Sequence, residues 1–323
     1  MIRRFGAVVV AIVLIVFFVA DGFASVKELP DDLRTFWEAR LTELSAVNPS
    51  YETTKPVIAD GIKTYEVKFM SYGNVPVHGV VAMPAKAKGK LPAILLLHGY
   101  GDYGRPEWAK RFAKKGFLAL AIDVRGHGQL AKEYNPEATD LIIKGIEKPE
   151  TYFLVGVLLD AIRGIDYLKT LPEAGSIYLN GTSMGGGTSM MLSVLDERMT
   201  AIAAGVPFLN DVPLGIEKAD GGPYPIVREF RSKLSKAGKA ADVAAADKTL
   251  TYIDVMRYAP YMKKPVLIGI GGADTICPEE GIQNTIKKIP DSTKKKVFRN
   301  AKAGHVVLPG WHDEVERWFK SNP

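Results

Sequence analysis

The sequence predicts an α/β fold in which a mostly parallel central sheet carries helices on both faces and a small cap insertion. Two observations predict it. Strand-like and helix-like segments alternate along the 323 residues, and several of the strand-like segments are continuous apolar runs. Alternation of this kind gives a parallel sheet between helical layers, and strands buried on both faces read as uninterrupted apolar runs. Because the pattern extends along the whole chain, we expect a single domain over residues 25–323.

The individual elements can be assigned in chain order. Residues 30–46 predict an amphipathic helix with Leu33, Trp37 and Leu41 on one face. Two segments of alternating polarity predict antiparallel strands at 65–70 and 77–82. Further strands are predicted at 93–97, 117–123, 176–180, 201–205, 266–271 and 296–300, with helices between them, notably at 152–171.

Two segments interrupt this alternation. Residues 210–247 contain Gly221-Gly-Pro223 and an Ala- and Lys-rich stretch that favours helix. We expect them to form an insertion that covers the functional site. Residues 129–149 form a second irregular segment.

The segment Gly181-x-Ser183-x-Gly185 lies between a predicted strand and a predicted helix. A nucleophile elbow has this context, because its sharp turn exposes the serine and requires small flanking residues. The bare pattern can also arise by chance in a chain with 31 glycines, so the flanking elements carry the argument. Ser183 is therefore the candidate nucleophile.

The candidate acid and base follow Ser183 in the chain order found in α/β-hydrolases. Asp274 comes just past the predicted strand 266–271, where such sheets place catalytic groups, although an Asp there can also cap the next helix. His305 lies in a glycine-containing loop after the last predicted strand, whereas His312 lies in a predicted C-terminal helix, where we expect a surface residue. We therefore expect an α/β-hydrolase fold with a Ser183, Asp274 and His305 triad.

These residue types suit nucleophilic catalysis. A serine hydroxyl needs a base, so His305 would take its proton while Asp274 holds the imidazole in the required tautomer. The oxyanion hole of such enzymes is formed by two backbone N–H groups. We assign them to Met184, which follows the nucleophile, and to Tyr100 in the loop after strand 93–97.

Other residues that could carry chemistry are interpreted as structural. His98 precedes Ser183 and breaks the expected order, Arg125 can hold neighbouring loops through their carbonyl groups, and Cys277 is expected to be a buried small residue. The five histidines show no metal-ligand spacing with acids, and the sequence contains no dinucleotide-binding motif. We therefore expect neither a metal nor a cofactor.

With these motifs, the chain resembles the acetyl xylan esterase and cephalosporin C deacetylase family, carbohydrate esterase family seven. The resemblance extends over nearly the whole chain after residue 24. It is carried by segments 29–38, 77–80, 98–101, 123–128, 181–186, 206–209, 252–256, 259–260 and 274–278. It implies a serine esterase acting on small acyl esters such as acetylated xylo-oligosaccharides, and it implies assembly into hexamers.

The sequence departs from the family pattern at three positions. His127 and Met184 each stand where the family usually has Gln, and Val306 stands where it usually has Glu after the catalytic histidine. None of the three belongs to the triad, and the Met184 backbone N–H does not depend on its side chain. The Met184 side chain places a polarisable apolar group beside the nucleophile, which suits a less polar substrate.

The N-terminal residues indicate export. Arg3 and Arg4 precede a continuous apolar run at 6–20, and small residues follow, which predicts a signal peptide over residues 1–24. If it is retained, this segment would anchor the protein to a membrane, although the run is shorter than the roughly 20 residues of a spanning helix. The net charge of +6 is mild, and no basic stripe is interleaved with aromatic residues, so we expect no nucleic-acid partner.

Taken together, the motifs predict an exported serine esterase, periplasmic or secreted, that forms an acyl-enzyme on Ser183. A second interpretation keeps the triad but changes the bond, as in a thioesterase or a peptidase. A third is a non-catalytic binding protein on the same fold, and the intact order of the triad residues argues against it.

Overall fold

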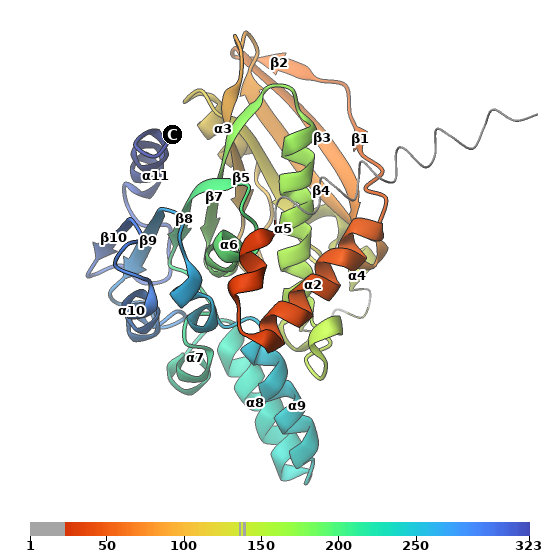
Figure 1. The fold of residues 1–323 in the computed structure, drawn as a ribbon, viewed down its shortest axis with the longest axis vertical. Coiled ribbons are helices and arrows are strands. Elements are labelled where there is room, and N and C mark those ends of the chain that lie inside the picture. Colours follow the sequence, from red (N-terminus) through yellow and green to blue (C-terminus); the bar gives the residue numbers. More distant parts are fainter. Residues whose placement is uncertain (1–22, 136, 138–139) are drawn as a thin grey trace, which may run out of the picture.

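The computed structural model describes residues 23–135, 137 and 140–323. Its centre is a ten-stranded sheet in the order β1-β3-β4-β6-β5-β7-β8-β9-β10, with β2 paired to β3 (Figure 1). The strands are β1 (Glu52–Thr53), β2 (Val57–Ala59), β3 (Ile62–Ser71), β4 (Val75–Pro84), β5 (Leu91–Leu97), β6 (Leu118–Asp123), β7 (Ala174–Thr182), β8 (Met199–Gly205), β9 (Val266–Gly271) and β10 (Lys295–Asn300).

The pairing of the strands matches the predicted sheet. Each neighbouring pair from β6 across to β10 is parallel, whereas β3, β4 and β6 pair antiparallel. All eight predicted strands are present. The short strands β1 and β2 were not predicted, because their exposed residues carry no alternating pattern.

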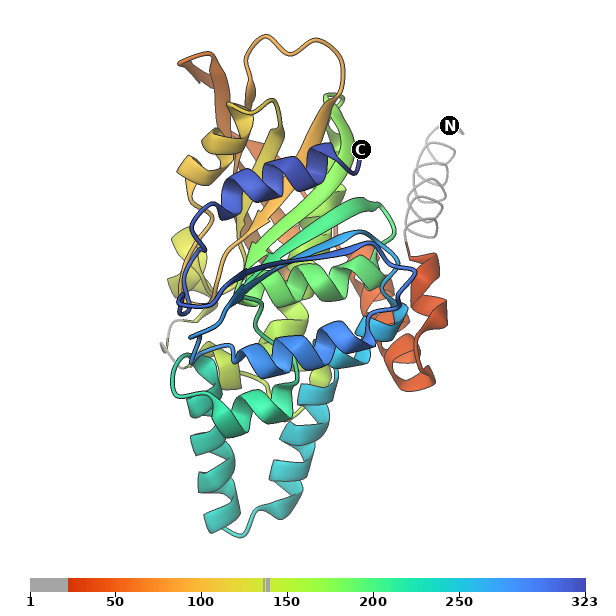
Figure 2. The same ribbon diagram turned by 90° about the vertical axis from the view of Figure 1, so that its left-hand side faces the viewer.

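Helices cover both faces of the sheet (Figure 2). Successive side chains of a strand point to opposite faces. In β5, Leu95 and Leu97 belong to one core, and Ile94 and Leu96 belong to the other. The first core is covered by α2 (Asp31–Ala46), α5 (Phe153–Thr170), α6 (Met184–Leu195) and α10 (Glu279–Lys288), and the second by α3 (Pro106–Ala113) and α11 (Trp311–Lys320).

The chain between β8 and β9 forms three helices, α7 (Val212–Lys218), α8 (Pro223–Lys236) and α9 (Ala240–Thr251). Helices α8 and α9 lie side by side and extend away from the sheet (Figures 1 and 2). The start of this region contacts the loop after β9, where the Asp220 N–H donates to the Thr275 carbonyl at 3.0 Å. The stretch predicted as an insertion at 210–247 is thus helical, and its base adjoins the loop that carries Asp274.

The other predicted segments have mixed outcomes. The irregular segment 129–149 contains short helical turns, among them α4 (Ala131–Tyr134) and the 3₁₀ turn Leu141–Ile143. The predicted signal peptide over residues 1–24 lies almost wholly outside the described residues. Within the part of the chain that is described, no helix is both long and apolar enough to cross a membrane.

The sheet topology also sets where the candidate site lies. Because β5, β7, β9 and β10 run in the same direction, their carboxyl ends meet at one edge of the sheet. The loops that leave this edge carry the residues singled out in the sequence. Ligand sites of open α/β sheets lie at this edge.

Candidate active site

Ser183 lies at the sharp turn between β7 and α6. Its backbone has φ 55° and ψ −115°, a conformation that costs about 1–3 kcal/mol for a residue with a side chain. The flanking glycines make the turn sterically possible. A Cβ atom added to Gly181 would lie 2.0 Å from the Gly185 carbonyl oxygen, and one added to Gly185 would lie 2.3 Å from the Leu97 carbonyl oxygen. The turn therefore has the geometry of a nucleophile elbow.

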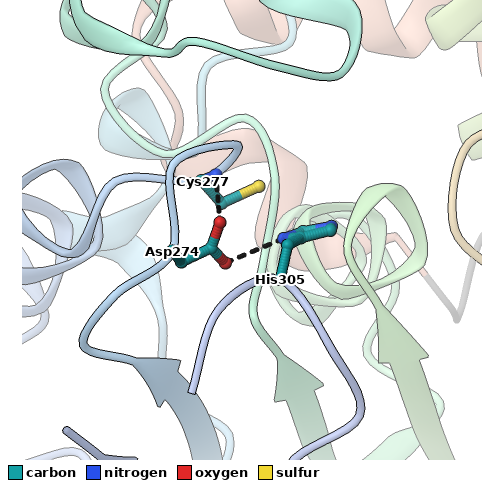
Figure 3. Close-up of side chains that lie close together, drawn as sticks. All are labelled: Asp274, Cys277 and His305. Carbon is teal, nitrogen blue, oxygen red and sulfur yellow. Dashed lines mark hydrogen bonds and ion pairs between the residues drawn. The ribbon is translucent and has the colours of Figure 1, made fainter. Parts of the chain in front are cut away.

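His305 links Ser183 to Asp274. Its Nε2 lies 2.9 Å from Ser183 Oγ, and its Nδ1 lies 2.8 Å from Asp274 Oδ2. Figure 3 shows the Asp274 and His305 side chains facing each other. Because the carboxylate accepts the Nδ1 proton, Nε2 keeps a free lone pair that accepts the Ser183 hydroxyl proton. The fold thus joins three residues that lie 91 and 31 positions apart in the chain.

Asp274 is held in place by its own loop. Its Oδ1 accepts the backbone N–H groups of Ile276 and Cys277 at 2.9 and 2.8 Å. Its side chain is fully buried, whereas the His305 side chain keeps 18% of its surface exposed. The capping interpretation and the triad interpretation of Asp274 are therefore compatible, since one oxygen shapes the turn and the other faces His305.

The loop after β5, residues 98–104, lies against Ser183. A Cβ atom added to Gly99 would lie 3.3 Å from Ser183 Cβ. The next residue is Tyr100, and within the described chain its backbone N–H donates no hydrogen bond. The same holds for the N–H of Met184, the first residue of α6, as expected for the first turn of a helix. Both N–H groups are thus available to an anionic oxygen near Ser183.

Two histidines tie this loop, hereafter the β5 loop, to the loop after β6. The Gly101 N–H donates to His127 Nε2 at 3.0 Å, and the Val124 N–H donates to His98 Nε2 at 3.2 Å. The Asp123 carboxylate accepts one further backbone N–H from each loop, at 2.7 and 3.1 Å. The shape of the β5 loop therefore depends on its neighbour.

Both of these histidines are neutral. Their Nδ1 atoms face the carbonyl oxygens of Gly99 and Arg125, so each ring donates from Nδ1 and accepts at Nε2. Burial lowers the pKa of His98, and burial together with the adjacent His98 ring lowers the pKa of His127 to about 4. The prediction that His98 is structural agrees with this environment. The contact of His127 with the β5 loop was missed, although β5 and β6 are adjacent parallel strands whose loops must meet.

Cys277 lies beside the candidate triad (Figure 3). It is buried, as predicted, and burial together with the Asp274 carboxylate raises the pKa of its thiol well above the usual range. A protonated thiol is a poor nucleophile. However, the ligand atoms of Asp274, Cys277 and His305 all lie within 4.8 Å of one another. The sequence spacing did not indicate this grouping, because the ends of two consecutive strands bring the three residues together; the expectation that no metal is bound stays a prediction.

Arg125 and His312 occupy structural positions. Arg125 is buried, makes a bidentate ion pair with Asp160 and donates to the Tyr72 carbonyl at 3.0 Å, so it holds neighbouring segments as predicted. His312 lies on α11 and contacts the Phe112 ring edge-on. It is partly buried rather than a surface residue, because α11 packs this side against α3.

Comparison with known proteins shows which family and which relatives the chain resembles. The model of the acetyl xylan esterase family (AXE1) matches residues 21–321. The chain is 27% identical over 270 residues to the acetyl esterase Axe7A of Xylanibacter ruminicola. This match covers 77% of the chain but 58% of the relative, so the chain spans less than two thirds of that protein.

Two solved structures share the fold over most of their length. An acetyl xylan esterase from Paenibacillus sp. R4 superposes with a TM-score of 0.82 at 25% identity, covering 91% of this chain and 96% of that one. Acetyl xylan esterase 1 from Thermoanaerobacterium sp. JW/SL YS485 gives a TM-score of 0.80 at 23% identity, covering 91% and 94%. At this identity the second likeness shows the fold alone.

Proposed function

The chain belongs to the acetyl xylan esterase family, a family of carboxylic ester hydrolases, and we propose that it removes small acyl groups through an acyl-enzyme on Ser183. One observation carries the proposal. His305 accepts from Ser183 Oγ at 2.9 Å while its other nitrogen is held by Asp274 at 2.8 Å. A hydroxyl, a base and an orienting carboxylate in line are the parts that nucleophilic acyl transfer requires.

The proposed reaction has two halves. In the first, His305 Nε2 takes the Ser183 proton as Oγ attacks the ester carbonyl, and it then passes that proton to the departing alkoxide. In the second, His305 takes a proton from water, which attacks the acyl-enzyme and releases the acid. Asp274 stabilises the imidazolium formed in each half.

The backbone N–H groups of Tyr100 and Met184 are the proposed donors to the oxyanion. Met184 follows Ser183 in the chain, and Tyr100 follows Gly99, which lies against Ser183. Neither N–H donates a hydrogen bond to another described residue. A single donor of this type is typically worth about 3–4 kcal/mol of activation free energy. The first turn of α6 adds the positive end of its dipole at the same place.

Acetyl esters of sugars are the proposed substrate class. Family membership supports an acetylated carbohydrate, and the relative from Xylanibacter ruminicola is described as an acetyl esterase. The residue after His305 is Val306, which is 52% exposed, followed by Val307 at 40%. This exposed apolar surface lies next to the proposed base in the chain.

Export and assembly complete the proposal. The charged and apolar pattern of residues 1–24 supports export to the periplasm or the medium, and the family resemblance supports a homo-oligomer. Light scattering of the protein that begins at residue 25 tests the second point, since a monomer at micromolar concentration would contradict it.

A labelling experiment tests the mechanism directly. A fluorophosphonate probe should modify the wild-type protein at Ser183 and should leave Ser183→Ala unlabelled. A panel of acetyl, butyryl, thioester and peptide substrates then separates an esterase from a thioesterase or a peptidase. Labelling at another residue, or wild-type turnover by Ser183→Ala, would show the proposed nucleophile to be wrong.

A further inference from the structure

The grouping of Asp274, Cys277 and His305 combines three kinds of metal ligand. A carboxylate oxygen, the Cys277 sulfur and an imidazole nitrogen all lie within 4.8 Å of one another. In Figure 3 the thiol and the carboxylate both lie on the side of the His305 ring that faces the loop after β9. Asp274 is oriented by two backbone N–H groups, so one ligand of the group is already fixed.

Thiolate, imidazole and carboxylate together are a ligand set suited to zinc. Zinc bonds are about 2.3 Å to sulfur and about 2.0–2.2 Å to nitrogen and oxygen, which places ligand atoms of a tetrahedral site roughly 3.3–3.7 Å apart. His305 Nδ1 and Asp274 Oδ2 now lie 2.8 Å apart in a hydrogen bond, so these two atoms must separate when an ion enters between them. Sulfur also selects thiophilic ions over Mg²⁺ and Ca²⁺, which prefer oxygen.

We propose that Asp274, Cys277 and His305 bind a thiophilic divalent cation such as Zn²⁺ or Cd²⁺, and that this ion reversibly inhibits the esterase. The ion forms bonds to the Cys277 sulfur, His305 Nδ1 and an Asp274 oxygen. The Cys277 proton leaves to solvent, the Nδ1 proton is replaced by one on Nε2, and no electron is transferred. A water molecule completes the tetrahedron. Inhibition follows because a His305 ring bound to the ion no longer accepts the Ser183 proton. Asp274, which is also bound to the ion, no longer orients that ring.

This inference rests on the proposed function, since it requires that His305 be the base. The ion and the reaction compete for the same imidazole, so inhibition should be relieved by a chelator. Cys277 distinguishes this site from nonspecific inhibition, because it is the single cysteine of the chain. Its backbone N–H, which donates to Asp274, is retained in Cys277→Ser and Cys277→Ala.

The first experiment measures inhibition of acetyl ester hydrolysis by Zn²⁺ in the wild-type protein, Cys277→Ser and Cys277→Ala. Each rate is expressed relative to the zinc-free rate of the same variant, and EDTA is then added. We expect both substitutions to raise the half-inhibiting concentration at least about tenfold, since even the loss of an outer-shell group costs about 10–100-fold in affinity. His312→Ala, which removes a histidine on α11, should keep the wild-type sensitivity. Equal sensitivity of the wild-type and both Cys277 variants would overturn the proposal.

A second experiment detects the ion without using activity. Co²⁺ bound by a thiolate gives a charge-transfer absorption in the near ultraviolet, which should appear with Ser183→Ala and be absent from Ser183→Ala/Cys277→Ala. If the band appears but the wild-type protein hydrolyses no ester, the metal site is right and the proposed function is wrong. If the wild-type protein is an active esterase and the band is absent, the metal site is wrong.

Discussion

Two loop regions flank Ser183, and both are built around histidine. On one side, the loop after β10 presents His305, whose Nε2 faces the Ser183 hydroxyl and whose ring is partly exposed. On the other side, His98 and His127 lie under the β5 loop, and each of their ring nitrogens faces a backbone group. The same side chain can thus be placed as the proposed base or can hold two loops together, and the partners of its two nitrogens distinguish the two cases.

The difference also has an electrostatic side. His98 and His127 are buried next to each other, with ring centroids 4.9 Å apart, and burial keeps both neutral. A neutral ring is required there, because Nε2 can accept a backbone N–H only while it is unprotonated. His305 instead has a carboxylate on Nδ1, which stabilises the imidazolium when Nε2 takes a proton.

The largest expected effect is on the His305 side. His305→Ala should lower kcat/KM for an acetyl ester by about 10⁴-fold or more, because the hydroxyl loses its base while the oxyanion donors remain. His312→Ala is the matched control, since this residue packs on Phe112 and should change activity by about twofold or less. Comparable losses in the two variants would contradict the assignment of the base.

A smaller effect is expected at His127, which together with His98 joins the β5 loop to the loop after β6; these two histidines are called the clamp below. His127→Ala removes the acceptor of the Gly101 N–H and should loosen the loop that carries the Tyr100 donor. We expect kcat to fall about 10–100-fold with little change in KM, less than the 10²–10³-fold cost of losing a donor outright. His127→Gln offers a side-chain oxygen to Gly101 and should recover most of this loss. If Gln and Ala behave alike, the hydrogen bond to the β5 loop is not what matters at this position.

The clamp should also make stability depend on pH. The pKa of His127 is about 4 in the folded protein and about 6.5 in an unfolded chain. Between these values the unfolded chain binds more protons than the folded one. The contribution of neutral His127 to the free energy of unfolding is therefore fully present above pH 6.5 and is lost as the pH falls toward 4. The difference corresponds to about 3 kcal/mol for this group.

Urea unfolding at pH 7 and at pH 4.5 measures this dependence. His127→Gln should show a shallower loss of stability than the wild-type protein. The slope in His127→Gln should not vanish, because the pKa of buried His98 is also lowered. An unchanged slope in His127→Gln would mean that His127 is not excluded from protonation by folding.

The two regions also differ in how far the sequence predicts them. The grouping of Ser183, Asp274 and His305 could be predicted because each residue follows a strand in the chain order of the proposed triad. The clamp could not, because a histidine in Arg125-Gly-His127 gives no sign of which backbone N–H it accepts. Cys277 was correctly expected to be buried, but the direction of its thiol depends on a turn that the side chain of Asp274 shapes.

The same limit applies to larger parts of the fold. The apolar strands were predicted because burial on both faces leaves a continuous run. The region between β8 and β9 was recognised as an interruption with a helix-prone stretch, but not as three helices, because a short helix such as α7 and a weakly amphipathic one such as α9 carry little apolar periodicity. Its outward direction follows from packing at its base, against Thr275 and Ile276, which no local pattern encodes.

The smallest expected effect concerns acyl size, at the junction of the two regions. Met184 provides a proposed oxyanion donor from its backbone, while its side chain is 1% exposed. The family resemblance implies a cramped acyl pocket beside the nucleophile, with Met184 and Pro207-Phe-Leu209 as its expected walls. An unbranched Met yields more easily to a longer chain than a hydrogen-bonded Gln. Because one methylene in an apolar pocket is worth about 1–3 kcal/mol, Met184→Gln should raise the acetyl-to-butyryl ratio of kcat/KM by about tenfold.

A buried amide without partners should also cost about 1–3 kcal/mol of stability, so the ratio is compared at a temperature where urea titration shows both proteins folded. If the ratio does not change, Met184 does not limit acyl size, and Pro207-Phe-Leu209, whose Phe208 N–H binds the Ser183 carbonyl, is the next wall to vary.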